Sequence, residues 1–94
     1  MKRSEAEAVL ETLVEDLAAI EHERWSHWQR YMHEKGERRA DGSLVLPAEL
    51  VRHWDTQIAT AYADLSELEK RSDREQVRRY LSLIAAALSE RATK

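Results

Sequence analysis

One helical face near the end of the chain changes along its length from charged to apolar. Its apolar members recur every three or four residues and are Val77, Leu81, Ile84 and Leu88. This spacing is typical of one face of an α-helix, and counting back along that face reaches Lys70, Asp73 and Arg74. A buried charge is costly unless it is paired or bound. The stripe therefore predicts a core-forming helix whose first turns hold either an ion-pair network or part of a ligand site.

The rest of the chain is also predicted to be helical. Among 94 residues there are only two glycines and one proline, which favours an all-α fold. We expect helices over Ser4–Lys35, Pro47–Tyr62 and Ser66–Ser89, and the first and third ranges each begin with the serine and glutamate spacing of a capping box. These ranges predict one domain over residues 1–94, a three-helix antiparallel bundle with a long N-terminal helix.

The connecting segment and the core follow from the same pattern. Gly36–Ser43 is polar and contains both glycines, so it is predicted to be a loop, and Leu44–Leu46 is too short to predict a strand. The residues expected in the core are Leu17, Trp28, Leu50, Trp54, Ile58, Val77, Leu81, Ile84 and Leu88.

Composition and helix length narrow the possible partners. The chain has no cysteine, and its net charge of −3, with both signs interspersed, argues against binding to a nucleic acid polymer. The N-terminal region has no apolar run long enough for a signal peptide or membrane span, so we expect a cytoplasmic protein without membrane contact. The long first helix would leave Val9, Leu10, Leu13 and Leu17 partly uncovered, which predicts a homo-oligomer, most simply a homodimer.

The first helix also contains a group of polar and aromatic residues. His22, Trp25 and Gln29 are spaced by three or four residues and therefore share one face. An indole beside an imidazole and an amide could stack on a planar heterocycle such as a nucleobase and hydrogen-bond to it. Alternatively, Trp28 and Trp54 could simply fill the core, and His22 could be a hydrogen-bonded histidine at a helix interface.

The charges before the apolar stripe allow the same two interpretations. Glu69 with Asp73, and Lys70 with Arg74, are like-charged pairs four residues apart, which destabilise an isolated helix. Each sign is therefore expected to find its partner outside this helix. That partner could be an anionic ligand or another part of the protein.

Catalysis has little support in the residues. His22 and Glu23 begin a zinc-protease pattern, but Ser26 stands where its second histidine would be. There is no glycine-rich phosphate loop and no convincing set of magnesium ligands. We therefore expect a protein that is not an enzyme and that uses neither a metal nor another cofactor.

Two segments resemble the ryanodine-receptor-type (RyR) domain. They are H-E-R-W at His22–Trp25 and Y-A-D-L-S-E-L-E-K-R-S-D-R at Tyr62–Arg74, and the similarity extends over about Leu17–Leu83. The segment that follows the first helix here, Lys35–Arg39, lacks the aromatic residues of the receptor repeats. The residues that match the shared pattern are His22, Trp25, Tyr62, Glu69, Lys70, Asp73 and Arg74.

The resemblance implies recognition of a nucleotide-derived small molecule. Small standalone members of this type look like bacterial and phage proteins, and a phage version would be a sponge that sequesters a host immune signalling nucleotide, an anti-defence role. The candidate ligand-binding residues are His22, Trp25, Gln29, Tyr62, Lys70, Asp73 and Arg74. The alternative is a structural or protein-interaction module that dimerises through its first helix and uses the polar motif as an internal salt-bridge network.

Overall fold

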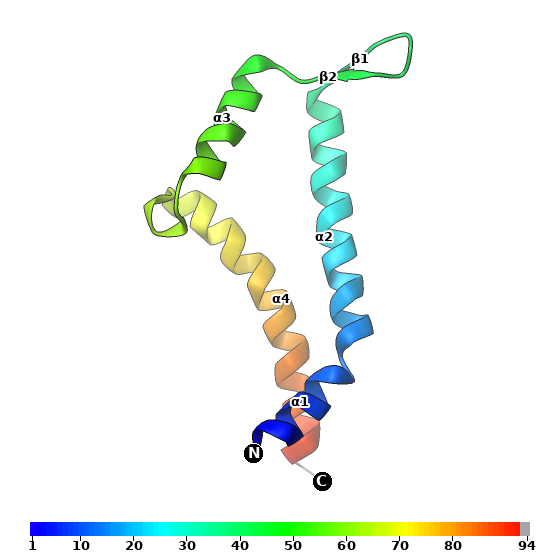
Figure 1. The fold of residues 1–94 in the computed structure, drawn as a ribbon, viewed down its shortest axis with the longest axis vertical. Helices are drawn as coiled ribbons and strands as arrows, with labels where there is room; N and C mark the ends of the chain where they lie inside the picture. The colour runs from blue at the N-terminus through cyan, green and yellow to red at the C-terminus, as the bar shows by residue number, and fades with distance from the viewer. Residues whose placement is uncertain (93–94) are drawn as a thin grey trace. The chain divides into compact units, whose positions relative to one another are not determined.

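The computed structural model describes residues 1–92 of the chain, with side chains as far as Glu90. Figure 1 shows the elements in chain order. They are α1 (Arg3–Glu11), α2 (Val14–Lys35), β1 (Glu37–Arg38), β2 (Leu44–Val45), α3 (Ala48–Ala59), the 3-10 turn η1 (Tyr62–Asp64) and α4 (Glu67–Ala92). Apart from the short strand pair, the regular structure is helical, so the prediction of an all-α fold is confirmed.

The chain divides into two compact units. Unit 1 contains Met1–Arg24 and, among the described residues, positions 72–92. Unit 2 contains Trp25–Arg71. Helices α2 and α4 each supply residues to both units, whereas α3 and the strand pair belong to unit 2 alone.

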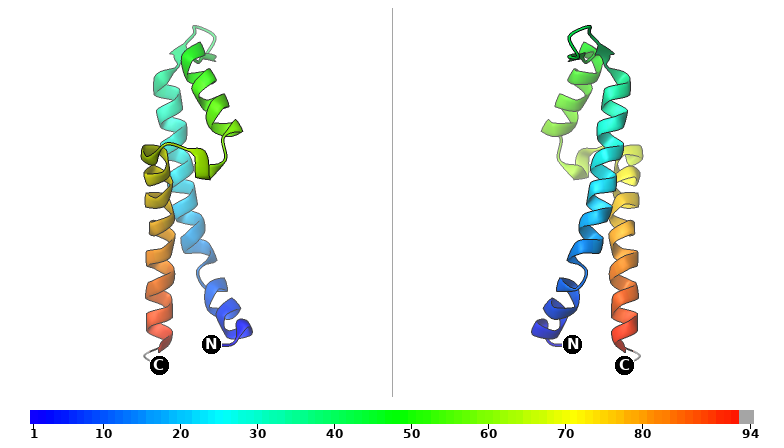
Figure 2. Two further views of the ribbon diagram at one scale, coloured as in Figure 1. Left: turned by 90° about the vertical axis from the view of Figure 1, so that its left-hand side faces the viewer. Right: turned by 90° about the vertical axis from the view of Figure 1, so that its right-hand side faces the viewer.

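Unit 1 combines α1 with the first part of α2 and the second part of α4. The second part of α4 lies beside the first part of α2 in the views of Figures 1 and 2, and hydrogen bonds from Tyr80 and Arg79 to α2 join them. Leu13 is 7% exposed and is the one buried hydrophobic side chain among those described. Val9, Leu17 and Ile20 are half-buried around it. Most of the strip that was expected to mediate dimerisation is thus covered within the chain.

The long N-terminal helix expected from the sequence is interrupted at Thr12 and Leu13. The Thr12 hydroxyl donates to the Val9 carbonyl at 2.6 Å, and the Thr12 N–H donates to the same oxygen at 3.2 Å. The Leu13 N–H also bonds three residues back, to Leu10. Bonds of this kind tighten the chain into a 3-10 turn, and a threonine hydroxyl that bonds back to the backbone bends a helix. The expectation of one uninterrupted helix was wrong for this reason.

The two predicted capping boxes have different outcomes. The first is absent, because α1 begins at Arg3 and Glu7 accepts a hydrogen bond from the Arg3 guanidinium at 2.8 Å. At the start of α4, the Ser66 hydroxyl accepts from the Glu69 N–H at 3.2 Å and donates to the Glu69 carboxylate at 3.0 Å. Ser66 thus satisfies a backbone donor that the helix itself leaves unpaired.

Unit 2 contains a hairpin where the sequence predicted a loop. β1 and β2 pair antiparallel, with Glu37 opposite Val45 and Arg38 opposite Leu44. Gly42 closes the turn with φ of 88°, a conformation that favours glycine. At Gly36 an added Cβ would lie 2.6 Å from Cγ of Leu44, so a larger residue there would displace the Leu44 side chain.

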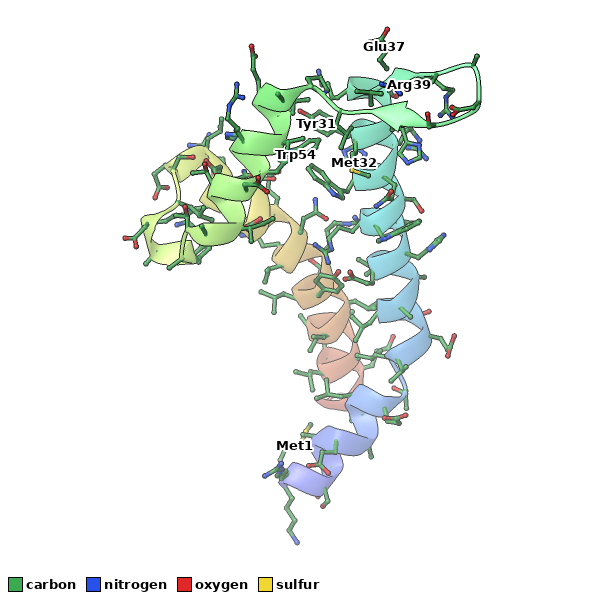
Figure 3. The ribbon with its side chains drawn as sticks, turned by 45° about the horizontal axis from the view of Figure 1, so that its top comes forward. Met1, Tyr31, Met32, Glu37, Arg39 and Trp54 are labelled. Carbon is green, nitrogen blue, oxygen red and sulfur yellow. The ribbon has the colours of Figure 1, made fainter. Side chains whose placement is uncertain are left out.

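Aromatic rings hold α3 against α2 within unit 2. Trp28 meets Trp54 edge to face with ring centroids 5.5 Å apart, and it stacks on Tyr31 at the same distance. Figure 3 shows Tyr31 and Trp54 pointing into the space between the two helices. Such ring pairs add stabilisation beyond the area that they bury.

Several residues assigned to the core are instead exposed, and on α4 the reason is that the helix presents a different face from the one expected. Ile58 is 83% exposed, Leu81 is 54% exposed, and Val77, Trp28 and Leu88 are also exposed. The half-buried residues of α4 include Gln76, Tyr80, Leu83 and Ala87, each one position before a member of the predicted stripe. One position is a rotation of about 100° around the helix. Of the predicted core, Leu17, Leu50, Trp54 and Ile84 are half-buried.

The burial of Leu13 leads to a stability prediction. Leu13→Ala should reduce the free energy of unfolding by about 2 to 5 kcal/mol, since it removes a buried side chain and leaves a cavity. Leu68→Ala is the matched control, because Leu68 is 73% exposed on α4. It should change stability by less than about 0.5 kcal/mol. Urea unfolding followed by circular dichroism measures both, and equal losses would contradict the assignment of Leu13 to the core.

Candidate functional site

A hydrogen-bonded ion-pair network lies in unit 1. The Arg24 guanidinium contacts both carboxylate oxygens of Glu21, with Nη2 at 2.5 Å from Oε1 and Nε at 3.4 Å from Oε2. The Tyr80 hydroxyl donates to Glu21, and Arg79 donates to Glu23. These contacts join α2 to α4 although their residues are more than fifty positions apart in sequence.

Electrostatics in this network follow from its hydrogen bonds. The Arg24 guanidinium, followed by the Tyr80 hydroxyl, holds the pKa of Glu21 below its ordinary value. The same bond to Glu21 raises the pKa of Tyr80. The side chains of Glu21 and Arg24 are about half exposed, so solvent screens the pair and its energetic contribution is small. The network fixes orientation more than it adds stability.

The seven sequence-predicted site residues are divided between the units. His22, Asp73 and Arg74 belong to unit 1, and Trp25, Gln29, Tyr62 and Lys70 belong to unit 2. Two of the seven contact each other: the Lys70 ammonium lies 5.8 Å from the centroid of the Tyr62 ring. That distance is within the range of a cation–π interaction. The remaining assignments stay predictions.

The exposure of these residues differs. Trp25 is 57% exposed and Tyr62 is 49% exposed, so both rings present area to solvent. His22 and Asp73 are exposed, whereas Gln29, Lys70 and Arg74 are half-buried. The predicted structural role of Trp28 and Trp54 agrees with their mutual ring contact.

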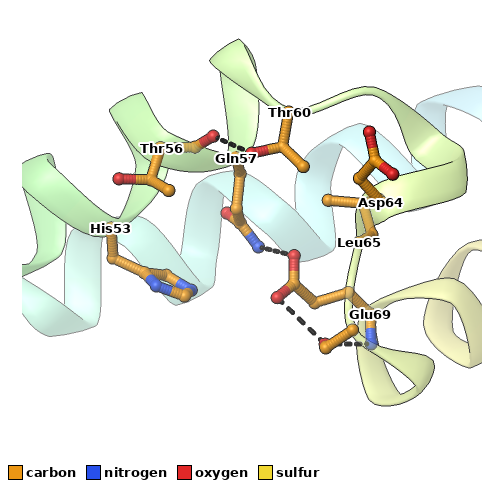
Figure 4. A pocket seen from close by; sticks show the side chains of 8 residues that line it. His53, Thr56, Gln57, Thr60, Asp64, Leu65 and Glu69 are labelled. Carbon is orange, nitrogen blue, oxygen red and sulfur yellow. Dashed lines mark hydrogen bonds between the residues drawn. The ribbon is translucent and has the colours of Figure 1, made fainter.

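A polar hollow of about 180 Å³ lies in unit 2, where α3, η1 and the start of α4 meet. Figure 4 shows its lining side chains. All but one of them are polar, with hydroxyl, amide, imidazole or carboxylate groups, and the exception is a leucine. The lining residues are His53, Thr56, Gln57, Thr60, Asp64, Leu65, Ser66 and Glu69.

Glu69 is at the centre of the hydrogen bonds in this hollow. Its carboxylate accepts from the Gln57 amide at 3.0 Å and from the Ser66 hydroxyl at 3.0 Å. The Gln57 bond, followed by the Ser66 bond, lowers the pKa of Glu69, and the electrostatic interaction with His53 acts in the same direction. The carboxylate is therefore ionised at neutral pH and links α3 to α4.

The sequence analysis missed this hollow, although the sequence contains a signal for it. His53, Thr56, Gln57 and Thr60 are spaced as i, i+3, i+4 and i+7, so they form a polar stripe on one face of α3. Only the apolar stripe of that helix was considered. Glu69 was identified through its like-charged spacing with Asp73 and through the resemblance, but it was not assigned to the ligand site.

Comparisons with known proteins do not indicate a family or a function for the chain, because it matches no protein-family model, no curated protein and no solved structure. The resemblance to the ryanodine-receptor-type domain therefore stays a prediction. Within residues 1–92, no three histidine or acidic side chains are placed to hold a metal ion together. In the same range, no helix is both long enough and apolar enough to cross a bilayer.

The Glu69 contacts lead to a pH prediction. Because the pKa of Glu69 is lowered in the folded chain, its ionised form contributes stability above the ordinary carboxyl pKa, and this contribution is lost as pH falls through the folded value. Gln57→Leu removes the hydrogen bond that is the main cause of the lowered pKa, so it should move the Glu69 titration to higher pH. Gln76→Leu, which replaces a glutamine of unit 1, should leave it unchanged. Carbon-13 NMR of the carboxyl group measures each curve, and coincident curves for the wild type and Gln57→Leu would exclude the link.

Proposed function

We propose that the chain is a non-enzymatic binding module that takes a nucleotide-derived small molecule in unit 2. The observation that carries this proposal is the polar hollow, whose lining residues are followed or preceded closely in sequence by the contacting pair Tyr62 and Lys70. η1 contains Tyr62 and also supplies Asp64 to the hollow, and α4 supplies Lys70 directly after Glu69. Hydrogen-bonding groups, an aromatic ring and a cation therefore occur within the short sequence segment from Tyr62 to Lys70.

The size and charge of the hollow limit how such a ligand would bind. Pockets that enclose a whole drug-sized ligand measure about 300 to 1,000 Å³. This hollow is smaller, so it would take one part of the ligand, a sugar or the edge of a base, through hydroxyl and amide groups. The carboxylates of Asp64 and Glu69 would repel a phosphate inside it. The phosphate is therefore expected outside the hollow, near the Lys70 ammonium.

Stacking on an exposed ring would complete recognition. Tyr62 exposes about half of its surface and lies closest in sequence to the hollow, while Trp25 offers the larger exposed indole on α2. A stacked base contributes about 1 to 3 kcal/mol when judged by alanine substitution. A cytoplasmic protein of this kind would act by holding its ligand out of solution, and in a phage it would serve as an anti-defence sponge.

The direct test is to look for a retained ligand and then to locate its phosphate. Native mass spectrometry of protein freshly purified from lysate would reveal a bound small molecule as added mass. Calorimetry with nucleoside 5′-monophosphates and the corresponding nucleosides would follow. Lys70→Ala should weaken binding of the monophosphate by about 10-fold or more, through loss of a charged hydrogen-bond donor, and should leave nucleoside binding nearly unchanged.

The chain contains a matched control for this experiment. Lys35 lies over Tyr31 at 5.4 Å, much as Lys70 lies over Tyr62, and it belongs to the same unit. Lys35→Ala removes the same charge from a similar ring contact but far from the hollow in sequence. Equal effects of the two substitutions would show that net charge alone governs binding. Absence of any nucleotide binding by the wild type would refute the proposal.

A second candidate function is a protein-interaction module. The ion-pair network favours this function, because its charged groups bind one another within the chain and not a ligand. Its contacts join Glu21 to Arg24 and Tyr80, and Glu23 to Arg79. The exposed leucines and valine of α4 favour it as well. In this case the polar residues orient α4 and the apolar ones recruit a partner.

A further inference from the structure

A continuous apolar seam runs along the exposed side of α4 within unit 1. Its residues follow alternating steps of four, three and four and are Val77, Leu81, Ile84 and Leu88. These are successive d, a, d and a positions of a heptad repeat. Val77 is 52%, Leu81 is 54% and Leu88 is 39% exposed, and Ile84 is half-buried.

Three of the four seam residues stay exposed within unit 1, because α4 uses another side to contact α2. Tyr80 and Arg79 donate to Glu21 and Glu23, which turns the side bearing Tyr80 toward α2. Two neighbouring helices bury one line of side chains between them, and a further apolar line needs another layer. Leu13 is the one buried hydrophobic residue among the described side chains. The apolar side chains of the seam are thus available for an intermolecular contact.

Charges beside the seam identify a second copy of this chain as the partner. In the same heptad register, Asp73 occupies a g position and Arg78 the following e position, and both are exposed. Five residues correspond to a turn of about 500°, so the two side chains point in different directions and do not form the usual i, i+3 or i, i+4 pair within α4. In a parallel coiled coil, however, a g residue meets the e residue of the next heptad on the partner helix.

We propose that α4 of one copy pairs in parallel with α4 of a second copy through this seam. A two-fold axis would then place Asp73 of each copy beside Arg78 of the other, so the surface is complementary to itself in both shape and charge. Arg74 occupies the a position at the start of the seam, where a polar residue sets register at a cost in stability. The pairing goes beyond the ligand-binding proposal and does not depend on it. It gives the protein-interaction function a defined surface, on α4 and not on the first helix.

The first test replaces an exposed apolar residue of the seam. Sedimentation equilibrium at micromolar concentration should show a dimer for the wild type. Leu81→Glu should weaken association by roughly 30-fold or more, as expected for a central interface residue. Because Leu81 is half exposed in the protomer, circular dichroism should show that helix content is kept. The control Leu68→Glu changes a 73% exposed leucine of α4 outside the seam and should leave the dimer intact. A monomeric wild type, or equal effects of the two variants, would overturn the proposal.

The second test uses the two charges. Asp73→Arg places Arg opposite Arg78 of the second copy, and Arg78→Asp places Asp opposite Asp73, so each variant alone should be largely monomeric. An equimolar mixture should form a heterodimer, because both cross-helix pairs regain opposite signs. A mixture that stays monomeric while the wild type is a dimer would overturn the parallel register. Calorimetry of Leu81→Glu with nucleoside 5′-monophosphate tests the other proposal separately, since ligand binding in unit 2 should persist in that variant.

Discussion

The rotational setting of α4 about its own axis determines which of its side chains contact α2 and which face solvent. The Tyr80 hydroxyl and the Arg79 guanidinium each donate to a glutamate of α2, and these two contacts lie one position apart on α4. Individually such exposed polar contacts contribute little free energy. Their effect is geometric, because they select one of two adjacent helix sides. The side bearing Tyr80 and Leu83 is turned inward, and the side bearing Leu81 is left outward.

Unit 2 uses polar contacts in a different way. The Glu69 carboxylate accepts from the capping hydroxyl of Ser66 at the beginning of α4 and from the Gln57 amide on α3, so one carboxylate supports the helix cap and joins the helix to a neighbour. These bonds keep Glu69 ionised and give the adjoining hollow a negative, hydrogen-bonding character. This character favours neutral parts of a ligand inside the hollow. Under the ligand-binding proposal a phosphate would lie outside the hollow, near Lys70, whose ammonium lies over the Tyr62 ring.

The two proposals assign separate tasks to the two ends of α4. Its first turn, with Glu69 and Lys70, belongs to unit 2 and to the ligand-binding proposal. Its second half, with Leu81 and its apolar neighbours, belongs to unit 1 and to the dimer. The like-charged pairs of α4, Glu69 with Asp73 and Lys70 with Arg74, are unfavourable within one helix and are consistent with this division. Lys70 would meet a ligand, and Asp73 would meet Arg78 of a second copy of the chain.

The sequence alone determined the helical class, the capping of α4 by Ser66 and one apolar line along α4, because propensity, capping and periodicity are local properties. It also contained the polar stripe of His53 and Gln57, although the stripe was not recognised. The break at Thr12 also has a local cause, a hydroxyl that bonds to the carbonyl three residues back, although helical periodicity does not reveal it. Tertiary structure decided that Leu81 faces outward, and it brought Gln57 to Glu69. Periodicity shows that a helix has an apolar side, but contacts made by residues distant in sequence decide whether that side turns inward.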